Sequence, residues 1–162
     1  MKINNNFLEM SINVSIMNEG EKKYKRFCDN IQATVFYLHQ SPDSFSEVIK
    51  KKGGKRPDFY HITPVGDFYV DVKSSKLNLY PKYTFSLDDY NKLKISQKIL
   101  KKPILIAYPI DPWSGEDWGF ISLTHMLCLK KEQKDLIQRG YRFIGINYSN
   151  LKKYEEILQL LI

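Results

Sequence analysis

The apolar run from Pro103 to Tyr108 constrains the fold of this chain more than any other segment. A strand whose side chains are apolar without alternation is covered on both faces, which is typical of the interior of an α/β sheet. Ahead of it, Ser86 and Asp89 form a capping-box-like start for a helix that we expect over residues 86 to about 101. A helix followed by a buried strand completes a β-α-β unit whose first strand includes residues 71–73. A right-handed crossover and a parallel strand pair are therefore predicted.

Helices and strands predicted on either side of this unit complete a mixed sheet. Asn18 is a candidate N-cap for a helix with apolar residues at helical spacing. Residues 58–62 and 68–74 predict a β-hairpin, and the residues that follow it, 75–85, are expected to form a loop. Further elements are expected as strands over 118–123 and 141–146, a short helix from Ser122 or Thr124, and a last helix capped by Asn150. This order fits an α/β or α+β fold, and we expect an α/β domain with a mixed central β-sheet flanked by helices.

Length and composition exclude several classes of protein. With 162 residues, of which 43% are hydrophobic, the sequence suits one globular domain over residues 1–162. Cys28 and Cys128 supply neither a disulfide framework nor a cysteine-rich zinc module. The sequence shows no membrane-spanning run and no secretory signal, so we expect a cytoplasmic protein without a membrane partner. The formal net charge of +7 is a modest hint of a polyanionic partner.

Acidic and basic side chains converge at the predicted hairpin. Asp58 follows a proline, and Asp71 and Lys73 share one face of the second strand because strand side chains alternate. A two-residue turn at residues 65–66 would place Asp58 directly opposite Lys73, and directly opposite residues share a face. We therefore expect these three side chains to lie together. The plainer interpretation is an exposed ion pair between Asp71 and Lys73. His61 falls on the opposite face and is expected to be an ordinary packed or surface histidine.

Two converging carboxylates repel each other unless a cation lies between them. Oxygen ligands favour Mg²⁺ or Mn²⁺, and the sequence has no His/Cys cluster for zinc. A lysine beside such a metal could orient or deprotonate an attacking water and offset charge on a phosphoryl transition state. Glu21 faces the buried side of the first predicted helix and could be a third carboxylate. A first-turn glutamate also has a plainer explanation, because acids there suit the helix dipole.

The pattern Pro57-Asp58 followed by Asp71-Val72-Lys73 resembles the PD-(D/E)xK nuclease superfamily. This superfamily includes restriction endonucleases, Holliday junction resolvases and some homing endonucleases. The resemblance covers about residues 18–110 and implies a restriction-endonuclease-like fold. It also implies that Asp58 and Asp71 bind a metal together with the Val72 backbone carbonyl, and that Lys73 is the catalytic lysine.

Two features of the helices extend the resemblance. Glu21 resembles the acidic residue of the superfamily's first helix, with Glu19 as a less well placed substitute. Many members also carry a further polar residue on the helix after the lysine. Asp89, Lys92 and Gln97 are all candidates for that position, and the sequence leaves the choice open.

The resemblance implies Mg²⁺-dependent hydrolysis of DNA phosphodiester bonds, with Mn²⁺ as a substitute and an endonuclease favoured; RNA stays open as a substrate. A basic loop directly precedes Asp58, and its two glycines predict a flexible segment rather than a helix or strand. Its basic residues, which could bind nucleic-acid phosphates, are Lys50, Lys51, Lys52, Lys55 and Arg56.

The sequence leaves the oligomeric state and the function open. Many relatives of this architecture pair up to cut both strands of a duplex, which makes a homodimer an expectation. The runner-up function is a catalytically inactive nuclease fold that serves as a nucleic-acid-binding or protein-interaction module. A third interpretation is an unrelated α/β domain that carries the motif by chance.

Overall fold

A five-stranded mixed sheet forms the centre of the computed structural model, which describes residues 17–39, 46–75, 78, 80–111, 116–133 and 136–161. Its strands lie in the order β1-β2-β3-β5-β6. They span Thr34–Tyr37 (β1), Phe59–Ile62 (β2), Phe68–Val72 (β3), Ile104–Pro109 (β5) and Trp118–Ser122 (β6). β3 and β5 are parallel, and the other neighbouring pairs are antiparallel. The predicted hairpin and the predicted parallel pair are confirmed, whereas β1 was not predicted.

A second, antiparallel sheet packs against the first and was not predicted from the sequence. It has the order β4-β8-β7 and consists of Lys82–Ser86 (β4), Leu136–Gln138 (β7) and Tyr141–Asn147 (β8). The prediction of a loop over residues 75–85 is wrong for β4. Only Tyr83 and Phe85 of this strand point inward, so its apolar pattern is too short to indicate a strand. Between β7 and β8, Arg139 and Gly140 both have positive φ (50° and 79°), as a two-residue hairpin turn requires.

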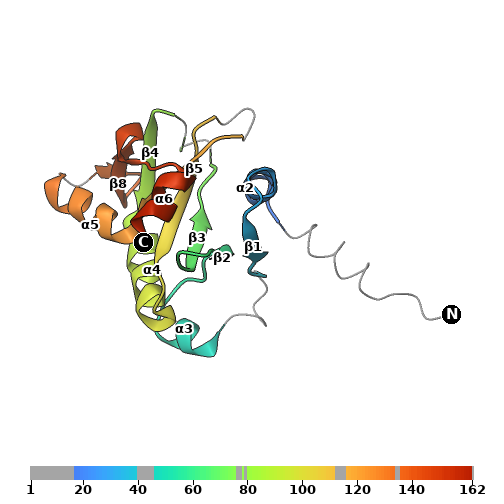
Figure 1. The fold of residues 1–162 in the computed structure, drawn as a ribbon. Coiled ribbons are helices and arrows are strands. Elements are labelled where there is room, and N and C mark those ends of the chain that lie inside the picture. Colours follow the sequence, from blue (N-terminus) through green and yellow to red (C-terminus); the bar gives the residue numbers. More distant parts are fainter. Residues whose placement is uncertain are drawn as a thin grey trace.

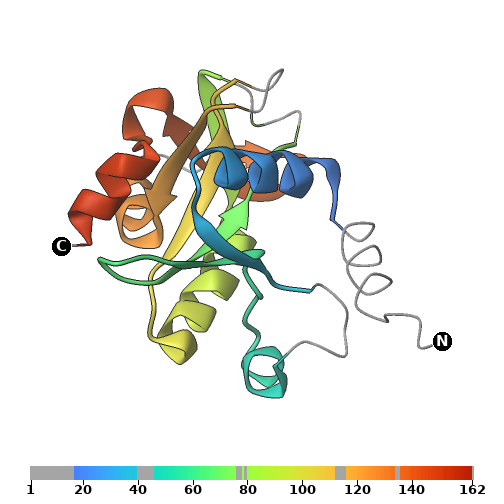
Figure 2. The ribbon, with the colours of Figure 1, turned by 45° about the vertical axis from the view of Figure 1, so that its right-hand side comes forward.

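Helices cover both faces of the central sheet (Figures 1 and 2). They span Glu19–Asn30 (α2), Glu47–Lys51 (α3), Leu87–Leu100 (α4), Leu123–Glu132 (α5) and Tyr154–Leu160 (α6). The predicted N-caps are confirmed for α2, α4 and α5, since the side chains of Asn18, Ser86 and Ser122 each accept a backbone hydrogen bond. The cap predicted for the last helix is wrong: Asn150 ends a short 3-10 turn, and α6 begins after Lys153. Within the described segments, none of the helices has the length and apolarity that crossing a membrane would need.

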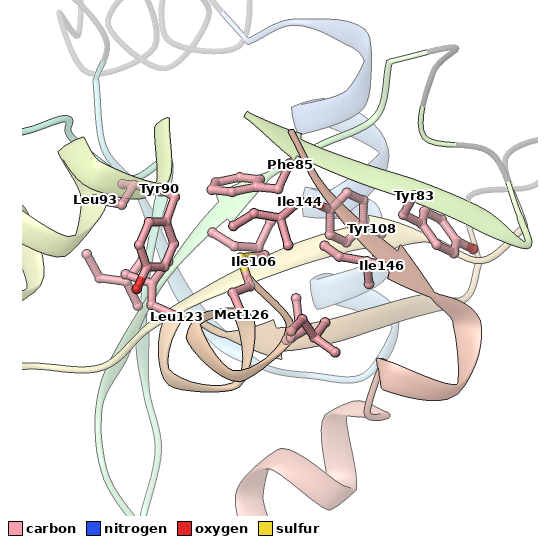
Figure 3. Packing of buried hydrophobic residues seen from close by; sticks show 13 residues of the cluster. Tyr83, Phe85, Tyr90, Leu93, Ile106, Tyr108, Leu123, Met126, Ile144 and Ile146 are labelled. Carbon is pink, nitrogen blue, oxygen red and sulfur yellow. The ribbon is translucent and has the colours of Figure 1, made fainter. Parts of the chain in front are cut away.

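Alternate side chains of β5 enter two separate apolar clusters, which explains why the run at residues 103–108 is continuous. Ile106 and Tyr108 pack with residues of β4, β8, α4 and α5 in the cluster that Figure 3 shows. Leu105 and Ala107 pack on the opposite face with residues of α2 and α6. Every residue of β5 is buried, so the expectation of a strand covered on both faces is confirmed. This burial fixes the neighbouring strand β3, which carries Asp71, at the centre of the molecule.

His61 on β2 points into the cluster beneath α2 and α6. Its side chain is fully buried, its ring stacks on Phe68, and its two nitrogens lie 3.0 Å and 3.3 Å from the hydroxyls of Tyr24 and Tyr154. Burial lowers the pKa of His61 to about 3 from an ordinary value of 6.5. The folded chain therefore holds this imidazole neutral, and the predicted placement away from Asp58 is confirmed.

Acidification is expected to destabilise the chain through His61. Between pH 6.5 and pH 3, the unfolded chain binds a proton at this residue that the folded chain does not bind. The free energy of unfolding therefore falls as the pH falls through this window, by about 1.4 kcal/mol per pH unit. Between pH 6.5 and pH 5, the free energy of unfolding measured in urea should fall by about 2 kcal/mol more for the wild type than for His61→Asn. The same pH slope in both chains would contradict this role of His61.

Candidate active site

The hairpin brings Asp58 and Asp71 side by side, with a register that differs from the predicted one. Phe59 pairs with Val70 and His61 with Phe68, so the residue opposite Asp58 is Asp71 and not Lys73. Because this shift is two residues, the side chains keep the predicted face. The Asp58 N–H donates to the Val70 carbonyl at 2.9 Å, and Asp58 Oδ2 accepts from the Val72 N–H at 2.7 Å.

The turn between β2 and β3 lies one residue earlier than predicted, and this causes the change in register: the Gly66 N–H donates to the Thr63 carbonyl at 3.3 Å around residues 64–65. Thr63 donates its hydroxyl to the Gly66 carbonyl at 2.6 Å, and its backbone N–H donates to Asp67 Oδ1. These bonds stabilise the turn, which is centred on residues 64–65 and not on the predicted residues 65–66. Gly66 has a φ of 143°, a backbone conformation that favours glycine.

Asp71 is the most deeply buried acidic residue of the site, with no exposed surface. Its Oδ1 lies 3.1 Å from Lys55 Nζ and its Oδ2 lies 2.9 Å from Lys73 Nζ. Although both distances are short, neither carboxylate oxygen accepts a hydrogen bond of normal geometry from the described part of the chain. Buried carboxylates are usually hydrogen-bonded. Both Asp71 oxygens therefore keep lone pairs that a cation could use.

Asp58 is almost fully buried next to this charge. Burial and then the negative charge of Asp71 raise the pKa of Asp58 to about 7, although the hydrogen bond from the Val72 N–H opposes them. The negative charge of Asp71 thus disfavours ionisation of Asp58 when no cation is bound. A divalent cation between them would remove this conflict, which agrees with the sequence-based interpretation of the pair.

Lys73 is held as an ammonium group by two carboxylates. Its Nζ lies 2.8 Å from Asp89 Oδ2 and 2.9 Å from Asp71 Oδ2, and it lies 5.4 Å from the centroid of the Phe85 ring. Burial lowers the pKa of Lys73, but the charges of Asp71 and Asp89 outweigh burial and raise the pKa above its ordinary value. In this state Lys73 suits charge stabilisation and orientation better than proton abstraction from water.

Asp89 in the first turn of α4 is the polar residue that the helix contributes. Its Oδ2 contacts the ammonium groups of both Lys73 and Lys55. The other two candidates on this helix are engaged elsewhere: Lys92 pairs with Asp88 on the surface, and Gln97 accepts the Ile104 N–H. Of the three candidates on this helix, only Asp89 contacts Lys73, so it is the polar residue that the helix brings to the site.

Glu21 is buried in the first turn of α2 and has both a structural role and a place near the site. Its carboxylate accepts from the backbone and side chain of Asn18 at 3.1 Å and 2.9 Å, and from the Tyr37 hydroxyl at 3.1 Å. The plainer helix-capping explanation therefore holds for Glu21. Its charge nevertheless reaches Asp58, whose pKa it helps to raise. Glu19, by contrast, is exposed and pairs with Lys22 on the surface.

The basic segment before Asp58 is more ordered than the sequence predicted. Lys50 and Lys51 form the last residues of α3, which corrects the expectation of a loop throughout. They are exposed, as is Lys52. Lys55 instead turns inward to Asp71 and Asp89. Arg56 is partly buried, and its charge interacts with Tyr37 and Asp58.

The donor set of the site matches a hard cation. Across the described ranges, no group of three or more His, Cys, Asp or Glu side chains forms a ready metal cluster. Mg²⁺, however, is commonly bound by only one or two protein carboxylates, with waters and substrate oxygens as its other ligands. The buried Asp71 carboxylate and the adjacent Asp58 carboxylate fit that pattern.

Comparison with known proteins identifies the fold. No protein-family model matches the sequence, and no curated protein matches it. Among solved structures, Hjc, a Holliday junction resolvase from the archaeon Archaeoglobus fulgidus, matches with a TM-score of 0.55 and 11% identity, over 88% of this chain and 97% of that chain. D212, a nuclease from a fusselovirus, matches with a TM-score of 0.49 and 13% identity, over 99% of this chain and 94% of that chain. The restriction-endonuclease-like fold, with its mixed central sheet flanked by helices, is confirmed by the resolvase match.

Proposed function

We propose that this protein is a divalent-cation-dependent nuclease that hydrolyses phosphodiester bonds of DNA, as an endonuclease. One observation carries the proposal: the carboxylates of the buried Asp58 and Asp71 lie side by side on neighbouring strands, next to the ammonium group of Lys73. A fold shared with a Holliday junction resolvase gives this arrangement a precedent for acting on nucleic acid.

Asp58, Asp71 and the Val72 backbone carbonyl would hold the cation, with Mg²⁺ as the expected ion and Mn²⁺ as a substitute. When bound, such a cation polarises a phosphoryl oxygen and lowers the pKa of its water. Asp71 is fully buried, and the Val72 N–H orients the Asp58 carboxylate through their 2.7 Å hydrogen bond.

Lys73 would contribute positive charge at the scissile phosphate. Its Nζ keeps its proton because Asp71 and Asp89 lie within 3 Å of it. An ammonium group placed before substrate arrives needs no reorganisation when negative charge develops on the phosphoryl oxygens. Asp89 would act as a positioning residue, since it fixes Lys73 without facing the phosphate itself.

Glu21 would serve as a third acidic residue near the attacking water, and a conservative substitution separates this role from capping. Because glutamine can also complete a capping box, Glu21→Gln should leave the free energy of unfolding within about 0.5 kcal/mol of wild type, whereas Glu21→Ala should lose about 1 kcal/mol. Cleavage by Glu21→Gln should fall at least about tenfold if the charge acts on the reaction. Wild-type cleavage by Glu21→Gln would leave Glu21 with the capping role alone.

The remaining parts of the proposal concern how nucleic acid is bound. The exposed Lys50, Lys51 and Lys52 would contact phosphates beside the scissile one, and Lys55 and Arg56 would extend this contact toward the site. We further propose a cytoplasmic protein of one domain that acts as a homodimer, since one subunit of this size offers little surface for both strands of a duplex.

Cleavage of a supercoiled plasmid tests the function directly. The purified chain should produce nicked or linear DNA in Mg²⁺ or Mn²⁺, and none in the presence of EDTA. An RNA transcript in the same buffers decides between DNA and RNA. Salt-dependent DNA binding without cleavage in any divalent cation would reject the nuclease and support the catalytically inactive binding module.

A further inference from the structure

Lys55 occupies an unusual place for a member of a basic surface segment. Its Nζ lies 3.1 Å from Asp71 Oδ1 and 3.1 Å from Asp89 Oδ2, so its ammonium group bridges a strand carboxylate and a helix carboxylate. The Asp71 oxygen that it approaches is fully buried and accepts no normal hydrogen bond within the described chain. Lys55 therefore occupies the position at Asp71 Oδ1 that a cation bound to this oxygen would take.

The backbone around Lys55 is built to keep it there. The Lys55 N–H donates to Ser96 Oγ at 2.9 Å, and the Ser96 hydroxyl donates back to the Lys55 carbonyl at 2.6 Å. Ser96 is fully buried on α4. A Cβ on Gly54 would lie 2.6 Å from Ser96 Oγ and 2.7 Å from a methyl group of Ile49, so only glycine allows this close approach. The anchored backbone aims a flexible side chain at the two carboxylates.

The balance of charge changes when a divalent cation arrives. Without it, the two carboxylates of Asp71 and Asp89 face the two ammonium groups of Lys55 and Lys73. A cation on Asp71 would repel both lysines, and one of them must withdraw. Lys73 has the more buried side chain of the two, with 21% of its surface exposed against 30% for Lys55, and it also contacts the Phe85 ring. Lys55 has the easier route outward.

We propose that Lys55 is a placeholder for the divalent cation at Asp71, and that Asp89 keeps its contact with Lys55 when the cation binds. This inference rests on the proposed function, because it assumes that Asp71 is a cation ligand. Lys55 and the cation then compete for Asp71 Oδ1. Asp89 acts as a positioning residue that keeps the displaced ammonium near the site, where it can meet a phosphate of the substrate.

Cation binding without nucleic acid tests the placeholder. The apparent affinity for Mn²⁺ is measured from thermal unfolding at increasing Mn²⁺ in wild type, Lys55→Met and Asp89→Asn. Without Mn²⁺, Lys55→Met should unfold about 3 °C lower, because Asp71 loses one of its two counter-ions. It should nevertheless bind Mn²⁺ about tenfold more tightly, because no ammonium competes. Asp89→Asn should bind Mn²⁺ more weakly, since both lysines are then left to Asp71 alone.

Two further variants keep the result interpretable. Lys55→Arg retains the positive charge and should bind Mn²⁺ within about threefold of wild type. Lys92→Met removes an exposed lysine of the α4 surface and should not change the affinity. Should Lys55→Met fail to fold, Lys55→Gln takes its place with the same expected tightening.

The outcomes separate the inference from the proposed function. If Mn²⁺ stabilises the wild-type chain but the uncharged Lys55 variants bind Mn²⁺ as weakly as wild type or more weakly, Lys55 is not a placeholder. That result leaves the proposed nuclease function unaffected. A wild-type chain that shows neither a Mn²⁺ response nor plasmid cleavage overturns the proposed function itself.

Discussion

Replacing Lys73 by methionine is expected to slow DNA cleavage by about a hundred- to a thousandfold while the chain still folds and binds a divalent cation. Methionine keeps an apolar stem beside the Phe85 ring, where Lys73 now lies. It removes the ammonium group that sits 2.9 Å from Asp71 and 2.8 Å from Asp89. The loss should appear in the single-turnover rate at saturating protein, because the group acts on the transition state more than on binding.

A matched control separates this effect from a general loss of positive charge. Lys94→Met removes an exposed lysine from the same helix that carries Asp89, and its cleavage rate should stay within about twofold of wild type. A Lys73→Met chain that cleaves at the wild-type rate would refute a catalytic role for Lys73, whatever its effect on stability.

Replacing Asp71 by asparagine is expected to reduce cleavage more than about a thousandfold and to remove the stabilisation of the chain by Mg²⁺ or Mn²⁺. Asparagine has nearly the same shape, but it carries no charge and presents an amide group in place of one carboxylate oxygen. Since the two Asp71 oxygens face the ammonium groups of Lys55 and Lys73, the amide NH2 would face a donor where it needs an acceptor. Cleavage and cation-dependent thermal unfolding should both be measured.

The neighbouring acid Asp88 supplies the control for this substitution. It lies in the first turn of α4 with an exposed side chain that pairs with Lys92. Asp88→Asn should therefore keep both cleavage and the cation response. If Asp71→Asn still responded to Mg²⁺ like wild type, Asp71 would not be a cation ligand, even if cleavage were lost.

The sequence predicted the centre of the fold well because the physical pattern there is unambiguous. Residues 103–108 have no polar position, and only a strand covered on both faces satisfies such a run. In the sheet of β4, β7 and β8, the strand predicted over residues 141–146 is confirmed as β8, whereas β4 and β7 were missed because they carry weaker signals. β4 has two inward apolar residues, and β7 has only three residues in all. Strands this short can be identified only once the residues that they pack against are known.

The shared face of Asp58, Asp71 and Lys73 was predicted correctly in spite of a wrong register. Strand side chains repeat every two residues, and moving the turn by one residue shifts the strand pairing by two, which changes partners but not faces. The role of Lys55 was not predictable in this way. Its contact with Asp89 joins residues 34 positions apart and depends on the anchor at Ser96, which no local pattern announces. The sequence indicated only a basic segment that suits phosphates.

The central claim is that Asp58 and Asp71 together hold a divalent cation. Anomalous diffraction from a crystal soaked in Mn²⁺ tests it most directly, because Mn²⁺ scatters anomalously and stands in for Mg²⁺. We predict one strong peak within coordination distance of both carboxylates, with Lys55 Nζ moved away from Asp71. A crystal that shows Mn²⁺ at other positions but none between Asp58 and Asp71 would contradict the account.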